Sequence, residues 1–215
     1  NEKFTNKIIT DLYDGDFYII RGAIKKKYIE NLKKNLTKYS AKKKSQFFQI
    51  KNNCPNFWRR QDEKIAKKYS VFAVRDSYYF FRWNKEKLKI WNNFNDVWRK
   101  IKYLGGLNPK DFEKNIPSDK VIDRVQIVRY PENTGMIEPH SHDPKNQRII
   151  ISVYMSEIGV DYLSGGTVFY KKNNKKIEVE KKIKTGDVGI FYGTLKHAVE
   201  PVKLLKISKS KNYNQ

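Results

Sequence analysis

Residues 130–144 read YPENTGMIEPHSHDP, and residues 197–202 read HAVEPV. The chain contains three histidines, and all of them lie in these two segments. His140 and His142 are separated by one residue, so on a strand their side chains would point to the same side. His197 follows 55 residues after His142. Because imidazole is a common metal ligand, this spacing predicts a metal site.

The residues around these histidines predict a β-rich core. From Val121 onward, short runs of apolar and β-branched residues alternate with turn signals such as Gly165-Gly166 and Gly186-Asp187. About eight strands are expected, over residues 123–130, 136–141, 148–155, 166–170, 176–183, 188–192, 197–202 and 204–208. Such a series predicts a sandwich or a jelly roll. The histidines then lie at strand ends, which a jelly roll brings together at its mouth.

The preceding residues predict a supporting layer. Helices are expected over residues 24–39 and 85–104, where apolar residues recur at helical spacing, and a shorter one over residues 1–13. Strands are expected at residues 17–20, 71–74 and 78–83, the last two joined by a turn at residues 75–77. The predicted fold class is therefore α+β and mainly β. It comprises one domain, residues 1–215, with residues 1–120 as the support and residues 121–208 as the core.

The composition is that of a globular protein with a strongly basic surface. Hydrophobic residues make up 39% of the chain, and the formal net charge is +22. This charge suggests a nucleic-acid partner, because lysine and arginine neutralise phosphates. However, 36 of the 45 basic residues are lysine, and arginine, the better bidentate ligand of phosphates and bases, is scarce. Nucleic acid is thus a possible partner that the composition does not favour.

Cysteine content and hydropathy indicate the compartment. The lone Cys54 cannot form an internal disulfide, as expected in a reducing environment. The longest apolar run, Ile149 to Met155, is too short to span a membrane. We therefore expect a cytoplasmic protein without a membrane span. The oligomeric state is not predicted.

Several segments of the core together resemble the Fe(II)- and 2-oxoglutarate-dependent oxygenases. In chain order they are Tyr130 with its glycine-containing loop, Pro139-His140, Arg148 opening a strand, the run from residue 161 to 169, Gly186-Asp187, and His197-x-Val-x-Pro-Val202. Their order and spacing are characteristic of that superfamily. The resemblance covers residues 121–208 and implies a double-stranded β-helix, also called a jelly-roll or cupin-like fold. It also implies an enzyme that uses Fe(II), 2-oxoglutarate and O2.

The resemblance implies that His140 and His197 are the first and last metal ligands. The second ligand stays open, because the family has His-x-Asp, whereas this chain has His142 followed by Asp143. Strand alternation favours His142, which would give a three-histidine site. Charge matching to Fe(II) favours Asp143, which a bulge before the next residue would bring inward. Glu138 is a more remote candidate.

Cosubstrate ligands are implied downstream of the last histidine. In the family, a basic residue there binds the far carboxylate of 2-oxoglutarate and is usually followed by a serine two residues later. Lys206 lies nine residues after His197 and Ser208 follows it, with Lys203 as the runner-up. Tyr130 and Arg148 are candidates for further hydrogen bonds to the cosubstrate. Tyr154 is a candidate for binding either the cosubstrate or the substrate.

The expected activity is hydroxylation of a small molecule or an amino-acid-like substrate. Arg59 and Arg60, which follow a tryptophan, are candidates to clamp an anionic group, and Arg75 and Arg82 are further candidates. Two other functions stay open. One is a cupin-like metalloprotein that does not use 2-oxoglutarate, and the other is a basic, non-catalytic module that binds nucleic acid.

Overall fold

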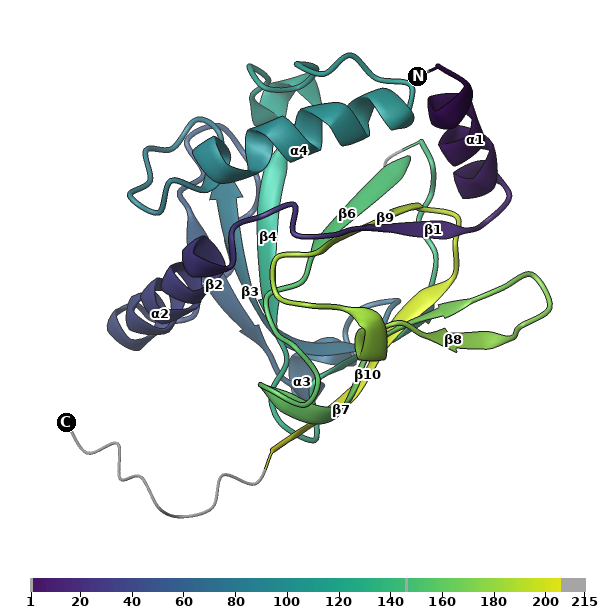
Figure 1. The fold of residues 1–215 in the computed structure, drawn as a ribbon. Coiled ribbons are helices and arrows are strands. Elements are labelled where there is room, and N and C mark those ends of the chain that lie inside the picture. The colour runs from purple at the N-terminus through teal and green to yellow at the C-terminus, as the bar shows by residue number, and fades with distance from the viewer. Residues whose placement is uncertain (1, 146, 206–215) are drawn as a thin grey trace.

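The computed structural model describes residues 2–145 and 147–205, and within them two antiparallel β-sheets form the core (Figure 1). The larger sheet has the strand order β2-β3-β5-β10-β7-β8, with β4 also paired to β3. The smaller sheet has the order β1-β9-β6. The sheets meet through apolar side chains, among them Phe169 and Phe191, whose rings lie 4.8 Å apart.

The larger sheet places the ends of several strands around one point. Its strands are β2 (Phe57–Gln61), β3 (Ala73–Phe81), β4 (Arg124–Arg129), β5 (Met136–His140), β7 (Tyr162–Tyr170), β8 (Lys176–Glu178) and β10 (His197–Leu204). β10 lies between β5 and β7, so that its first residue is opposite the last residue of β5. β3 pairs with β5 through its first two residues and with β4 from Asp76 to Phe81.

The smaller sheet combines strands from both ends of the chain. It consists of β1 (Phe17–Ile20), β6 (Ile149–Val153) and β9 (Val188–Tyr192). β9 is the central strand, and its first four residues are buried because both of its faces are covered. β1 pairs with β9 from Phe17 to Ile20, so the N-terminal region contributes directly to the core.

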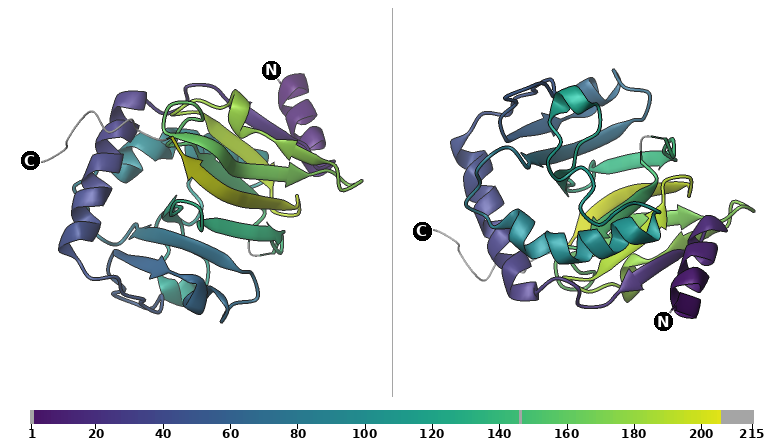
Figure 2. Two further views of the ribbon diagram at one scale, coloured as in Figure 1. Left: turned by 90° about the horizontal axis from the view of Figure 1, so that it is seen from below. Right: turned by 90° about the horizontal axis from the view of Figure 1, so that it is seen from above.

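Helices cover the sheets from two sides (Figure 2). The α-helices are α1 (Glu2–Tyr13), α2 (Lys26–Lys42), the short α3 (Glu63–Ala66) and α4 (Ile90–Leu104), and the 3-10 helices are η1 (Pro117–Asp119) and η2 (Glu180–Lys182). α2 runs along one side of the molecule between the two sheets, and α4 crosses β4 and β6 (Figures 1 and 2). Both bury a stripe of apolar side chains at helical spacing. No helix among the described residues is long and apolar enough to cross a membrane.

The fold class predicted from the sequence is confirmed, but several element boundaries differ. Residues 75–77 form no turn, because β3 continues through them, with Asp76 and Ser77 buried. β2 was not predicted, and β8 ends at residue 178 before η2. The two strands expected over residues 197–208 form one strand, β10, whose described part ends at residue 204.

The Gly165-Gly166 pair lies inside β7 and not in the turn that the sequence suggested. Gly165 has a φ of +94°, and a Cβ atom on it would lie 2.1 Å from the carbonyl oxygen of Pro201. Glycine is therefore required where β7 passes the irregular part of β10.

Candidate active site

The structure brings the three histidines together where β5 ends and β10 begins. His140 ends β5, His197 begins β10, and the two residues are direct partners in the β5–β10 pair. The ring centroids of these two lie 4.4 Å apart, and the ring of His142 lies 4.9 Å from His140 and 5.1 Å from His197. One nitrogen of each ring lies within 4.8 Å of the others. The chain therefore offers three imidazole ligands to one ion.

Backbone carbonyls fix the orientation of two of these rings. Nδ1 of His140 lies 2.8 Å from the carbonyl oxygen of Glu138, and Nδ1 of His197 lies 2.8 Å from that of Leu195. Because a carbonyl oxygen only accepts, each Nδ1 carries the proton and donates it. Nε2 of both rings is thus left with a free lone pair, the arrangement that metal-binding histidines use.

The surroundings also favour the neutral, ligating form of the rings. Burial lowers the pKa of His197 to about 4, and the charges of His140 and His142 lower it further against the opposing hydrogen bond to Leu195. Burial also lowers the pKa of His142, with smaller contributions from His140 and Arg75. At neutral pH His142 and His197 are therefore uncharged, so a metal ion would not have to displace a proton from a cationic ring.

His142 lies outside any strand and is held by the chain that follows β9. Its backbone nitrogen donates a hydrogen bond of 2.7 Å to the carbonyl oxygen of Gly193. A Cβ atom on Gly193 would lie 2.2 Å from the carbonyl oxygen of Gln147 and 3.2 Å from the Cβ atom of His142. Only glycine permits this close approach, so Gly193 positions His142 beside the other two histidines.

The two carboxylate candidates are not part of this cluster. Asp143 is exposed, and its Oδ1 accepts a hydrogen bond of 2.9 Å from the backbone nitrogen of Lys145. Glu138 accepts one of 2.9 Å from the backbone nitrogen of Phe72. Within residues 2–145 and 147–205, the group that could hold a metal ion consists of the three histidines alone.

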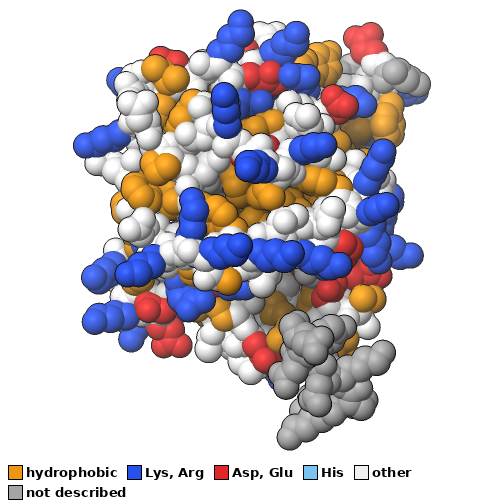
Figure 3. Space-filling view, turned by 90° about the vertical axis from the view of Figure 1, so that its left-hand side faces the viewer, with side chains coloured by type: hydrophobic (Ala, Val, Ile, Leu, Met, Phe, Trp, Pro, Cys, Tyr) orange, Lys and Arg blue, Asp and Glu red, His pale blue; other side chains and the backbone are white. Residues whose placement is uncertain are grey.

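A cavity of about 2120 Å³ opens beside the histidines. It exceeds the roughly 1,000 Å³ upper end of ordinary ligand pockets, so both a cosubstrate and a substrate have room. The larger sheet, β6 and part of α2 line it. On the side of the molecule where α2 lies, hydrophobic side chains gather in the centre and basic side chains border them (Figure 3).

Three of the predicted cosubstrate ligands, Tyr130, Arg148 and Tyr154, lie on the cavity wall, whereas the exposed Lys203 does not. Burial raises the pKa of Tyr130 to about 12, although the charge of Arg75 and a side-chain hydrogen bond with Arg75 oppose this. Burial likewise raises the pKa of Tyr154, whose buried hydroxyl lies near Thr167 but makes no hydrogen bond of good geometry within the described residues. Arg148 donates a hydrogen bond of 3.2 Å to the carbonyl oxygen of Gly105. Lys206 and Ser208 lie outside the described residues.

The arginines expected to bind substrate differ in their surroundings. Arg59 bonds to the hydroxyl of Tyr69 at 2.6 Å, and Arg60 pairs with Asp76 at 3.1 Å, both at the cavity wall. Arg82 pairs with the buried Asp123 at 2.7 Å and does not line the cavity.

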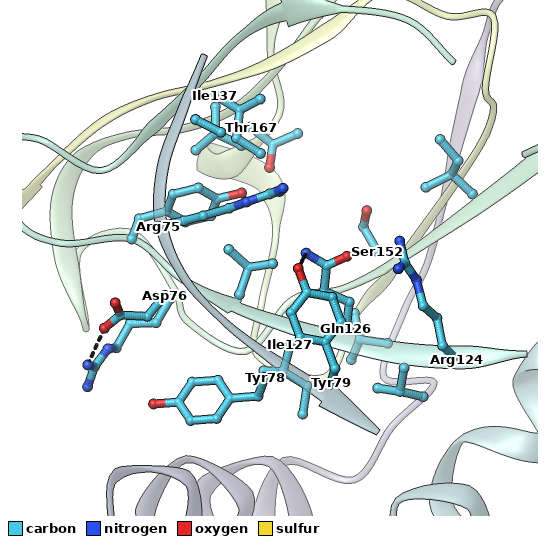
Figure 4. Close-up of a pocket in the computed structure, with 18 of the residues that line it drawn as sticks. Arg75, Asp76, Tyr78, Tyr79, Arg124, Gln126, Ile127, Ile137, Ser152 and Thr167 are labelled. Atoms are coloured by element: carbon cyan, nitrogen blue, oxygen red, sulfur yellow. Dashed lines mark hydrogen bonds and ion pairs between the residues drawn. The ribbon is translucent and has the colours of Figure 1, made fainter. Parts of the chain in front are cut away.

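The cavity also contains residues that the sequence interpretation missed. Arg124 and Gln126 of β4 line it, as does Thr167 of β7 (Figure 4). Strand alternation carried a usable signal, because Arg124 and Gln126 are alternate residues of one predicted strand and therefore share a face.

Comparisons with known proteins agree with the fold. The sequence matches no protein-family model, and no curated protein is significantly similar to it. Among solved structures, a prolyl-4-hydroxylase of Pseudomonas putida superposes with a TM-score of 0.60 at 10% identity, covering 93% of this chain and 92% of that one. A prolyl hydroxylase of Trichoplax adhaerens, solved with a hypoxia inducible factor peptide, gives 0.56 at 14% identity, covering 94% and 85%.

A third match is the viral collagen prolyl hydroxylase of Paramecium Bursaria Chlorella virus-1, solved with 2-oxoglutarate. Its TM-score is 0.51 at 15% identity, and 89% of this chain and 92% of that chain are covered. At such identities these matches establish the fold. The predicted double-stranded β-helix, and with it the resemblance to the Fe(II)- and 2-oxoglutarate-dependent oxygenases at the level of the fold, is confirmed.

Proposed function

We propose that the protein is an Fe(II)- and 2-oxoglutarate-dependent oxygenase that hydroxylates a small molecule or an amino-acid-like substrate. The observation that carries this proposal is the convergence of three imidazoles beside the large cavity of a double-stranded β-helix. The matched structures are named as prolyl hydroxylases, which supports hydroxylation as the reaction class.

The donor set fits Fe(II). Imidazole is a good ligand of this ion, and three ligands on one face leave room for a bidentate keto acid and for dioxygen. The nitrogens lie within 4.8 Å of one another. At that separation the three side chains could hold one ion together. We therefore assign His140, His142 and His197 as the ligands, with Asp143 as the alternative to His142.

The chain's own residues bind, orient and exclude water. When bound, iron and 2-oxoglutarate supply the oxidising chemistry that lets dioxygen hydroxylate an unactivated carbon. We assign the Tyr130 and Tyr154 hydroxyls, together with Lys206 and Ser208, to the binding of 2-oxoglutarate, because both tyrosines face the cavity as neutral donors. Phe191 packs against the His197 ring, with a centroid distance of 4.9 Å, and keeps water from that side of it.

An anaerobic titration tests the proposal. The protein is loaded with Fe(II) and then titrated with 2-oxoglutarate while the visible spectrum is recorded. A weak metal-to-ligand charge-transfer band is expected, because an iron-bound keto acid produces one. Iron binding without this band would instead indicate a cupin-like metalloprotein that does not use 2-oxoglutarate. Failure to retain iron would instead favour the interpretation as a basic, non-catalytic module that binds nucleic acid.

Two variants decide the second ligand. His142→Ala should abolish iron retention, as should His197→Ala, because each removes one of only three donors. Asp143→Ala should retain iron at the wild-type level, because its carboxylate is engaged with Lys145 in a turn. The reverse pattern would reassign the second ligand to Asp143. Metal content after gel filtration is the measurement.

A further inference from the structure

Most charged side chains in the cavity wall already have partners. The carboxylate of Asp76 pairs with Arg60 at 3.1 Å and with Arg129 at 2.5 Å. The carboxylate of Glu180 accepts hydrogen bonds from the Tyr162 hydroxyl at 2.6 Å and from the backbone nitrogen of Thr167 at 2.7 Å. These charged groups are therefore neutralised or hydrogen-bonded within the protein, and they give no indication of a bound ligand.

Arg75 is different, because part of its guanidinium group is buried without a partner. It lies on β3, on the face that lines the cavity, and Figure 4 shows it beside Ile137 and Thr167. Its Nε is buried and makes no hydrogen bond within the described residues. A buried donor without an acceptor costs about 1–3 kcal/mol, so such groups usually mark a missing ligand or water.

Arg124 is the second guanidinium of the cavity without a carboxylate partner among the described residues, whereas Arg75 interacts through a side-chain hydrogen bond with Tyr130. Its side chain is exposed, yet burial lowers its pKa, as does the charge of Arg75. The two observations agree if the exposed surface faces the cavity, as Figure 4 shows. The guanidinium lies 5.6 Å from the ring centre of Tyr79, and neither Arg75 nor Arg124 forms an ion pair within residues 2–145 and 147–205.

Arg75 and Arg124 line the same cavity. Arg124 is opposite Phe81 in the β3–β4 pair, and therefore six residues beyond Arg75 along β3, which is about 20 Å of strand. Both side chains extend into the cavity, and Arg75 is near enough to influence the titration of Arg124. Two cations in one cavity without a carboxylate counterion repel one another, and a bound anion would reduce that repulsion.

We propose that Arg75 and Arg124 recognise an anionic group, a carboxylate or a phosphate, on the substrate of this enzyme. This inference rests on the proposed oxygenase function, and it narrows the substrate to an anionic small molecule. Guanidinium groups suit both anions, because they donate two parallel hydrogen bonds. Gln126, which donates to the Tyr79 hydroxyl at 3.3 Å, adds a polar group beside the site.

The cosubstrate 2-oxoglutarate is also a carboxylate. The experiment must therefore distinguish the binding of 2-oxoglutarate from the binding of an anionic group of the substrate. The protein is loaded with Mn(II) and saturated with 2-oxoglutarate under anaerobic conditions, and inorganic phosphate is titrated in by calorimetry at constant ionic strength. The variants are Arg75→Gln, Arg124→Gln and the double variant. Lys196→Gln removes one exposed positive charge outside the cavity and serves as the control for net charge.

Phosphate should bind the wild type and the Lys196→Gln variant equally, and the double variant at least about tenfold more weakly. The dissociation constant of 2-oxoglutarate should stay within about threefold in all variants. Equal phosphate affinity in the wild type and the double variant, or no phosphate binding to the wild type, would overturn the proposal. So would a tenfold weaker binding of 2-oxoglutarate to Arg75→Gln, which would assign that residue to the cosubstrate.

The same experiment separates this proposal from the proposed function. If the protein retains neither Mn(II) nor 2-oxoglutarate, the oxygenase assignment fails. Arginine-dependent phosphate binding by that protein would then still support the anion site.

Discussion

Arg82 and Arg124 lie almost side by side in the sheet and have opposite environments. Arg82 follows the last residue of β3, and Arg124 is the partner of that last residue on β4. The Arg82 guanidinium turns away from the cavity, toward α4, where it meets the buried Asp123 at 2.7 Å and stacks on Trp91 at 4.0 Å. The Arg124 guanidinium turns into the cavity and has no carboxylate partner among the described residues.

This difference distinguishes charges that stabilise the fold from charges that are available to a ligand. Asp123 accepts hydrogen bonds from Arg82 at 2.7 Å and from the fully buried Lys102 at 2.8 Å, and Trp98 donates to it at 3.3 Å. Every partner in that cluster comes from the chain itself. In the cavity, by contrast, the guanidinium groups of Arg75 and Arg124 have no carboxylate partner among the described residues, and Nε2 of His140 and of His197 has a free lone pair. Such groups are available to bind a ligand.

The largest expected effect comes from breaking the paired cluster. Asp123→Ala leaves Arg82 and Lys102 buried without their shared carboxylate, and Lys102 is 0% exposed. The free energy of unfolding should fall by about 3–5 kcal/mol, the cost of breaking a buried ion pair from one side. Urea denaturation measures it. Glu178→Ala, which breaks only exposed pairs with Lys176 and Lys181, should cost less than about 1 kcal/mol. Equal effects of the two substitutions would refute the distinction.

Acidification should reveal the partly buried histidine cluster in the metal-free protein. The pKa of His197 is lowered from 6.5 to about 4 in the folded state. Between these values the unfolded chain binds a proton that the folded chain does not, so stability falls as the pH falls through this window. The loss begins below pH 6.5, is complete near pH 4, and should reach on the order of 2–3 kcal/mol.

A variant isolates this contribution from the carboxylates that titrate in the same range. His197→Gln has no titrating ring, so the difference in unfolding free energy between it and the wild type should shrink or change sign between pH 7 and pH 4, because only the wild type pays the protonation penalty. A constant difference across that range would mean that His197 titrates normally in the folded chain.

The sequence predicted the parts of the molecule that depend on local pattern. Strand alternation and helical spacing located most elements and placed His140 and His197 at strand ends. His142 joins them from a loop that is hydrogen-bonded to Gly193, which strand alternation did not predict. The sequence could not show that residues 75–77 continue a strand, because Arg75-Asp76-Ser77 has the composition of a turn. Asp76 is accommodated in the strand by ion pairs with Arg60 and Arg129, which are distant in sequence. The sequence likewise suggested both Arg82 and Arg75 as substrate ligands and favoured Arg82. Only tertiary structure shows which of them has a carboxylate partner.

Moving His142 should weaken the site with a smaller loss of stability. In Gly193→Ala, the added methyl group meets the carbonyl oxygen of Gln147 at 2.2 Å and the Cβ atom of His142 at 3.2 Å, so the loop that holds His142 must shift. Metal affinity should fall by about 10–100-fold, as expected when a ligand loses its support. Gly159→Ala is the control, because its φ of +80° is strained but no atom lies within 4 Å of the added methyl group. Loss of metal affinity in both variants would indicate general destabilisation.

The smallest expected effect is that of Arg124→Met, and it gives the most direct test of the comparison. The same type of substitution should change stability in the opposite direction at the nearby Arg82. Arg82→Met removes one of the two cationic partners of the buried Asp123 carboxylate and should lower the free energy of unfolding by about 1.5–3 kcal/mol. Arg124→Met removes a cation that has no counterion and keeps an apolar chain over Tyr79, so it should raise the unfolding free energy by about 0.5–1 kcal/mol. Denaturation of the ligand-free protein in a chloride buffer without phosphate measures both. Added phosphate should stabilise the wild type and not Arg124→Met, which would reverse their order. If Arg124→Met destabilises the ligand-free protein as Arg82→Met does, the guanidinium of Arg124 stabilises the fold and is not a ligand-binding group.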